Sequence, residues 1–223
     1  MRERAFVPYR SANPVNRREF HMVTAANAQN SGKLVGKDFI FIAIFGVLLF
    51  VVFFIFAMLL GMNANTFWFT HAIGAIPAGI VWMYLLARVP KRGAILIMSV
   101  LVAVVALLLG MLWTGPVGII VGGILAELIV SVGKRSAVKD TIAFAVWTLA
   151  FWVGQQSMIF FAGDSYVDMV VQSGMSVEYG QTLVSFMQSP LIAVAGVGCV
   201  AGALIGGFLG AKIFKKHFAK IAA

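Results

Sequence analysis

Five uncharged side chains that can form hydrogen bonds lie in or beside the long apolar stretches of this sequence: Asn63, Trp68, His71, Gln155 and Gln156. Trp68 and His71 are three residues apart, a spacing that predicts a shared helix face. Gln155 and Gln156 lie inside an apolar stretch, where each amide needs a partner. Polar and aromatic groups that converge in this way can form a small-molecule pocket. An interfacial aromatic belt with ordinary hydrogen-bonding caps is the alternative.

Glu127 is the only acidic residue inside one of the membrane spans predicted below. Ionisable groups within a membrane are candidates for function. Glu127 precedes Lys134 by seven residues, which places it about 10 Å from the end of its helix. A carboxylate at this shallow depth can pair with a loop cation. We therefore interpret Glu127 as a structural or partner-contacting group rather than as a proton relay.

Sequence motifs for catalysis are absent. The chain has no G-x-x-x-x-G-K-[ST] phosphate loop, so we do not expect it to hydrolyse ATP itself, and it has no H-E-x-x-H or G-x-S-x-G. His21, His71 and His217 are too scattered for a metal site, and Cys199 is the single cysteine. We expect a protein that is not an enzyme and that carries no metal or other cofactor.

The composition predicts a membrane protein. Of 223 residues, 61% are hydrophobic and 11% charged, against roughly 45–50% and 25% in soluble domains. Six apolar stretches are long enough to be spanning helices, and they cover residues 39–61, 67–87, 94–112, 117–132, 142–162 and 191–214. The predicted fold is an all-α integral membrane protein, a compact bundle of six transmembrane helices.

The distribution of charge predicts the orientation. Lys and Arg total 17 against 8 acidic residues. All basic residues fall within residues 2–37, 88–92, 134–139 and 212–220, which lie on one side of a six-helix topology. Because basic loops stay in the cytoplasm, we expect a multi-pass plasma-membrane protein with both termini inside. Short clusters between apolar stretches do not resemble a nucleic-acid surface, so no nucleic acid is expected as a partner.

Two segments lie outside the predicted spans. Residues 1–37 are basic and lack apolar periodicity, and we interpret them as a disordered cytoplasmic tail that contacts anionic headgroups. The membrane domain is then residues 38–223. Its outer segment, residues 163–190, is the only outer connection long enough to cover a binding site.

A stripe of small residues marks the last predicted span. Gly198, Gly202, Gly206 and Gly210 recur every four residues. Small residues at this spacing let helices approach closely in lipid. The stripe packs inside the bundle or forms a docking surface for another membrane subunit, and the sequence alone leaves both interpretations open.

Four segments resemble a known family. They are RVPKRGAILIM (88–98), AELIVSVGKRS (126–136), GMSVEYGQTL (174–183) and GALIGGFLGAKIFKKHFAKIA (202–222). Together they resemble the Trep_Strep family, also called MptD-like, a group assigned as S components of energy-coupling factor (ECF) transporters. The similarity in layout covers most of residues 37–222.

The resemblance implies a six-helix substrate-binding subunit that captures a small nutrient at the outer face. In ECF transporters such a subunit associates with a transmembrane coupling protein and two cytoplasmic ATPases. Many S components carry an Ala-x-x-x-Ala contact motif in their first helix, whereas here Ala43 is followed by Val47. The expected partner contacts are therefore Ala43, Gly46, Glu127, Gly202 and Gly206. The competing hypothesis is a non-transporting membrane scaffold or assembly protein, in which the outer polar groups are dispensable.

The predicted topology is open to a direct test. Single cysteines at Asn63, Trp113 and Ser173 should react with a membrane-impermeant thiol reagent from the outside, because the positive-inside rule places these loops there. A cysteine at Ser136 should react only from the cytoplasm. Reaction of the Ser173 cysteine from the cytoplasm alone would refute the topology.

Overall fold

The structure, a computed structural model, describes residues 32–214, and all regular secondary structure in this range is helical. The elements are α2 (Gly36–Gly61), η1 (Phe67–Phe69), α3 (Thr70–Arg88), α4 (Ala94–Leu108), α5 (Thr114–Ser131), α6 (Ala137–Phe161), α7 (Gly163–Gln172), α8 (Val177–Met187) and α9 (Leu191–Ile213). Most of the predicted tail, residues 1–31, lies outside the described residues. The last two residues of that tail, Gly36 and Lys37, belong to α2.

Five helical segments are long and apolar enough to cross a membrane: α2, η1 with α3, α5, α6 and α9. The sixth predicted span is a helix, but it is shorter than the sequence indicated. Helix α4 has 15 residues and ends at Leu108 rather than at residue 112. Gly110 has φ +84°, and the Met111 amide donates to the Ala106 carbonyl at 2.9 Å. This glycine-based Schellman motif stops the helix.

Two further elements differ from the sequence prediction. Helix α6 begins at Ala137, five residues before the predicted start, because the Ser136 hydroxyl caps it by accepting from the Lys139 amide at 3.3 Å. Asp140 therefore lies in the first turn of a spanning helix. The outer segment is not a loop but two short helices, α7 and α8, joined through Gly174 at φ +91°.

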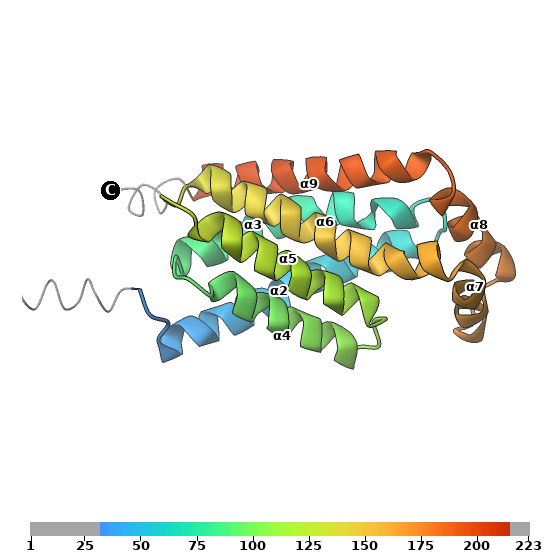
Figure 1. The fold of residues 1–223 in the computed structure, drawn as a ribbon, viewed down its shortest axis with the longest axis horizontal. Coiled ribbons are helices and arrows are strands. Elements are labelled where there is room, and N and C mark those ends of the chain that lie inside the picture. The colour runs from blue at the N-terminus through green and yellow to red at the C-terminus, as the bar shows by residue number, and fades with distance from the viewer. Residues whose placement is uncertain (1–31, 215–223) are drawn as a thin grey trace, which may run out of the picture. The chain divides into compact units, whose positions relative to one another are not determined.

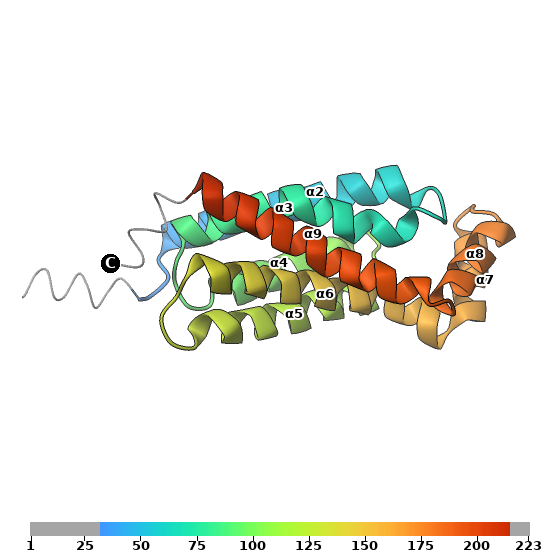
Figure 2. The same ribbon diagram turned by 90° about the horizontal axis from the view of Figure 1, so that it is seen from above.

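The long helices pack side by side along the bundle. Helix α2 contacts α3 and α4, α4 also contacts α5, and α5 lies along α6. Figure 2 shows α9 crossing diagonally over α3 and α6, and it contacts both. The last helix thus ties the N-terminal half of the bundle to the C-terminal half.

Glycines set the closest helix contacts. A Cβ added at Gly206 would lie 2.6 Å from the Ile76 carbonyl oxygen of α3, and one at Gly202 would collide with the Ala72 carbonyl. Between α5 and α6, a Cβ at Gly118 would lie 2.9 Å from Gly154 Cα. These backbones touch, so the stripe predicted in the last span packs inside the chain.

A chain of aromatic rings runs through the bundle core. Ring centroids of Trp82 and Trp147 are 5.6 Å apart, and those of Trp147 and Phe151 are 5.8 Å apart. Both indole N–H groups are satisfied: Trp82 donates to the Asp140 carbonyl at 3.1 Å and Trp147 to the Ser99 hydroxyl at 2.9 Å. Buried polar groups in this part of the core therefore have partners.

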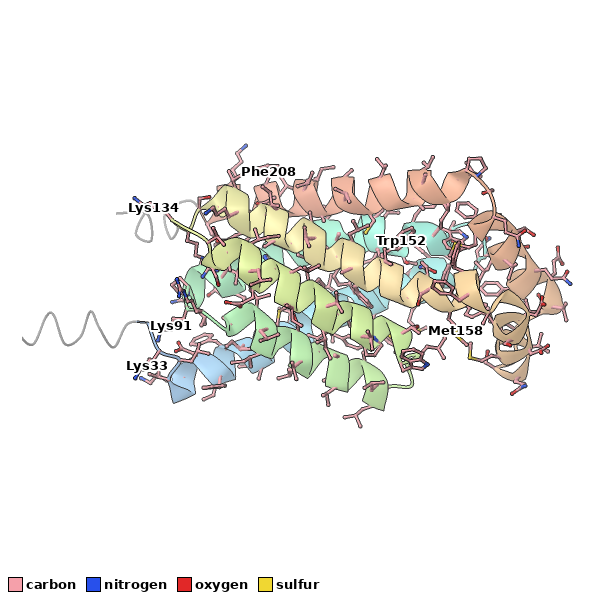
Figure 3. All side chains as sticks on the ribbon, viewed as in Figure 1. Lys33, Lys91, Lys134, Trp152, Met158 and Phe208 are labelled. Carbon is pink, nitrogen blue, oxygen red and sulfur yellow. The ribbon has the colours of Figure 1, made fainter. Side chains whose placement is uncertain are left out.

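Polar contacts fasten the basic end of the bundle, where the connections α3–α4 (89–93) and α5–α6 (132–136) lie. The Lys91 ammonium pairs with Asp38 at 2.7 Å, and Arg135 Nε pairs with the buried Asp140 carboxylate at 3.0 Å. Lys91 and Lys134 mark this end in Figure 3. The pair Asp38–Lys91 joins α2 to the α3–α4 connection, which are far apart in the sequence.

Alanine substitutions test the backbone contact between α3 and α9. Gly202→Ala should lower the free energy of unfolding by about 1–3 kcal/mol, because the new Cβ forces two backbones apart. Gly198→Ala is the matched control: its Cβ would meet only Ala72 Cβ, at 3.7 Å, an ordinary contact. Denaturant titration in detergent micelles measures both variants. Equal stability of the two variants would show that α9 does not touch α3 at Gly202.

Candidate functional site

Helices α7 and α8 lie across the end of the bundle opposite the basic end (Figure 1). We call this pair of helices the cap and the end that it covers the capped end. The capped end also holds η1, the C-terminal part of α6 and the start of α9. Trp152 and Met158 mark it in Figure 3. The outer segment singled out in the sequence therefore lies where a cover for the polar side chains would be needed.

Few contacts hold the cap in place. The indole of Trp68 stacks on the ring of Phe186 in α8, with centroids 4.7 Å apart and planes at 11°. The Tyr179 hydroxyl donates to the Gly61 carbonyl at the end of α2. Burial raises the pKa of Tyr179, so the phenol keeps its proton and donates throughout the neutral range. Tyr166 and Leu183 pack into the same cluster.

The structure separates Asn63 from the other predicted site residues. Asn63 is exposed, and its Oδ1 accepts from the Asn65 amide at 2.9 Å, a contact local to the turn after α2. Its side chain stabilises that turn and does not line the pockets described below. The amide therefore forms the cap of a connection, which was the alternative interpretation.

Trp68 and His71 do not share one helix face, because Trp68 belongs to the 3-10 helix η1 and His71 to α3. Both are buried, with 0% and 4% of their surfaces exposed. Trp68 contacts Phe186 of the cap, whereas the His71 ring lies 4.6 Å from that of Phe151, measured between centroids. Trp68 Nε1 and His71 Nε2 have no hydrogen-bond partner.

The two glutamines line different pockets. Gln155 lines a space of about 30 Å³ with His71 and Thr70, which is enough for a water or two. Gln156 lines a pocket of about 250 Å³ with Trp152, Phe160, Phe161 and Ile192, among others. We call the larger space the Gln156 pocket. Adjacent residues on a helix point in different directions, so one α6 segment serves both spaces.

The Gln156 pocket contains unpartnered polar atoms in an apolar setting. Gln156 is 3% exposed and Trp152 is 7% exposed. Both amide atoms of Gln156 and the indole Nε1 of Trp152 have no hydrogen-bond partner. The sequence pointed to Gln156 and missed Trp152 as a site residue, although the indole lies one helical turn before the amide. Unlike Trp82 and Trp147, this tryptophan has an unsatisfied N–H.

The residues expected to contact a partner make contacts within the chain. Glu127 accepts from the amides of Gly93 at 2.7 Å, Ile95 at 3.1 Å and Leu96 at 3.3 Å. It therefore caps the start of α4 from the neighbouring helix α5, in the manner of an N-cap. This interaction satisfies the carboxylate, in agreement with a structural role.

The small residues predicted at partner contacts are placed as follows. A Cβ at Gly46 would lie 3.2 Å from Met98 of α4, and Gly202 and Gly206 face α3. Contact of these three glycines with another subunit would require helices of the bundle to separate. Ala43 is half-buried on α2. Its contact with a partner stays a prediction.

The sequence profile of a family described as "Hypothetical bacterial integral membrane protein (Trep_Strep)" matches residues 36–220. The chain belongs to the Trep_Strep family. The match begins where α2 begins and covers every described helix, so the bundle and its cap are both parts of the Trep_Strep region. No curated protein and no solved structure matches the chain. The family resemblance found in the sequence is thus confirmed, and the protein is an integral membrane protein.

The Tyr179 hydrogen bond predicts how firmly the cap is held in this Trep_Strep protein. Tyr179→Phe removes one hydrogen bond, worth about 1 kcal/mol, so cap opening should increase about fivefold. Amide hydrogen exchange across residues 163–187 measures it. Tyr84→Phe is the control, since Tyr84 accepts from Arg88 outside the cap. Unchanged exchange in Tyr179→Phe would show that this bond does not hold the cap.

Proposed function

We propose that this protein is the substrate-binding S component of an ECF transporter, capturing a small nutrient at its outer face for uptake by partner subunits. The observation that carries the proposal is the Gln156 pocket, in which three buried polar atoms of Gln156 and Trp152 have no partner. Membership in a bacterial integral membrane family supports a function in the membrane.

Energetics favour binding over a purely structural role for this pocket. A buried polar group without a partner costs about 1–3 kcal/mol. A side chain retained only for packing would be apolar at this position, as its neighbours Val153 and Phe160 are. A ligand that bonds to the amide and the indole removes this cost when it binds, which converts the unsatisfied groups into affinity.

The cap supports access to the pocket. Met187 of α8 and Ile192 of α9 line the Gln156 pocket, so movement of the cap changes the pocket wall. The described part of the cap contacts the bundle through the Trp68–Phe186 stack, the Tyr179 bond and a small apolar cluster. Segments with few buried contacts are the ones that open locally, and lids of this kind enclose ligands.

In this proposal the energising subunits are separate chains, a transmembrane coupling protein and two ATPases. The chain lacks a phosphate-binding loop. Helix α2 is the least buried of the spanning candidates, with 28% of its most apolar window buried. Ala43 lies on this helix, and we propose the α2 face as the contact with the coupling protein.

Transport assays test the proposal. Small molecules that co-purify with the full chain are identified by mass spectrometry, and their uptake is then measured in cells. Uptake should require an added ECF module and ATP, because the chain cannot energise transport itself. Uptake by the chain alone, in a host without such a module, would contradict the proposal.

Two alanine variants connect transport to the amides. Gln156→Ala should weaken binding of the co-purified molecule about 5- to 150-fold, since a ligand group loses its partner. Gln155→Ala should have a smaller effect, because Gln155 lines the small space beside His71. Gln181→Ala, on the exposed face of α8, is the control. Wild-type affinity in both variants would favour the membrane scaffold.

A further inference from the structure

The walls of the Gln156 pocket limit the charge of what can bind there. The lining residues are Trp152, Val153, Gln156, Ser157, Phe160, Phe161, Met187 and Ile192, and none of them is ionisable. Burying a charged group without a counter-charge costs several kcal/mol. Asp164 lines a neighbouring pocket that shares Phe160 and Met187, but it is exposed and does not line this one. A ligand held by this pocket is therefore uncharged.

The unpartnered atoms define the hydrogen bonds that the ligand must make. The Gln156 amide offers one acceptor oxygen and two donor hydrogens, and the Trp152 indole offers one donor. A carboxamide pairs in two-point fashion with a group that has a donor and an acceptor side by side, as glutamine does with adenine. A cyclic amide has such an edge. Its second lone pair, or another acceptor on the ring, is left for the indole N–H.

The pocket's shape and rim select for a flat, mainly apolar body. Its volume, about 250 Å³, lies just below the usual range of about 300–1,000 Å³ for ligand sites. Three of its lining side chains are aromatic, and aromatic rings favour stacked or edge contacts with other rings. Val153, Phe160 and Phe161 are 52%, 66% and 82% exposed, so the rim is apolar. An acyl chain would fit the walls but leave Gln156 unsatisfied.

We infer that the substrate class of this site is an uncharged heteroaromatic compound of one or two rings that carries a cyclic amide edge, bound by Gln156 and Trp152. The inference rests on the proposed function, because it assigns the ligand of the same site. It adds three restrictions that the proposed function does not contain: no net charge, a donor next to an acceptor, and a ring system small enough for the pocket.

A matched set of probes tests these restrictions on the full chain in lipid nanodiscs. Quinazolin-4-one has two rings and a cyclic amide edge. Its 3-methyl derivative lacks the amide donor, its 2-carboxylate is an anion, and its 2-aminomethyl derivative is a cation at neutral pH. Tryptophan fluorescence and equilibrium dialysis measure binding. Quinazolin-4-one should bind at least tenfold more tightly than each of the other three compounds.

Variants assign this selectivity to the two side chains. Gln156→Met keeps the size of the side chain but removes the amide, and it should reduce quinazolin-4-one binding about tenfold and abolish the preference over the 3-methyl compound. Trp152→Phe should weaken binding about fivefold, because the ring stays while the N–H is lost. Gln181→Met, exposed on α8, should bind as the wild type does.

The outcomes separate the substrate class from the proposed function. Equal or tighter binding of a charged probe, failure of quinazolin-4-one to bind, or a co-purified acyl lipid in place of a ring compound would overturn the inferred class. A co-purified nutrient that is charged, yet taken up with an ECF module in a Gln156-dependent way, would overturn the class and leave the proposed function intact. Absence of module-dependent uptake would instead refute the proposed function.

Discussion

Direct contact between helix backbones is the constraint on which this structure depends. In lipid, apolar side chains gain nothing by leaving the solvent, so helices associate through close packing and interhelical polar contacts. Gly202 and Gly206 of α9 bring its backbone against that of α3, and Gly118 and Gly154 do the same between α5 and α6. Since α9 also contacts α6, these two pairs are joined into one bundle.

This packing decides where polar groups can be satisfied. Near the basic end and in the middle, the buried carboxylate of Asp140 and the indoles of Trp82 and Trp147 all have partners. At the capped end, Trp68, His71, Trp152, Gln155 and Gln156 keep unpartnered atoms. The same residue type is thus satisfied in one half of the bundle and unsatisfied in the other, which separates a structural half from a binding half.

The sequence predicted the helices better than the site. Apolar length located all six long segments, because a spanning helix must be continuous and apolar. The end of α4 was missed because the Gly110 turn depends on one backbone dihedral angle within an apolar run. The cap was read as a loop, since α7 and α8 are too short and mixed in composition to be distinguished from a connection. Polar type alone identified Gln156, but the opposite environments of Asn63 and Trp152 depend on tertiary packing that no local pattern encodes.

The short helix α4 has a consequence for the surrounding bilayer. Its 15 residues extend about 22 Å along the axis, whereas the hydrocarbon core of a typical bilayer is about 30 Å thick. Val100, Val104, Leu107 and Leu108 are exposed on this helix, so acyl chains lie against it. Hydrophobic mismatch of this size is relieved by local thinning of the bilayer. The protein therefore carries its own zone of deformed membrane on one side, and a chain surrounded unevenly in this way has a preferred direction in which to tilt.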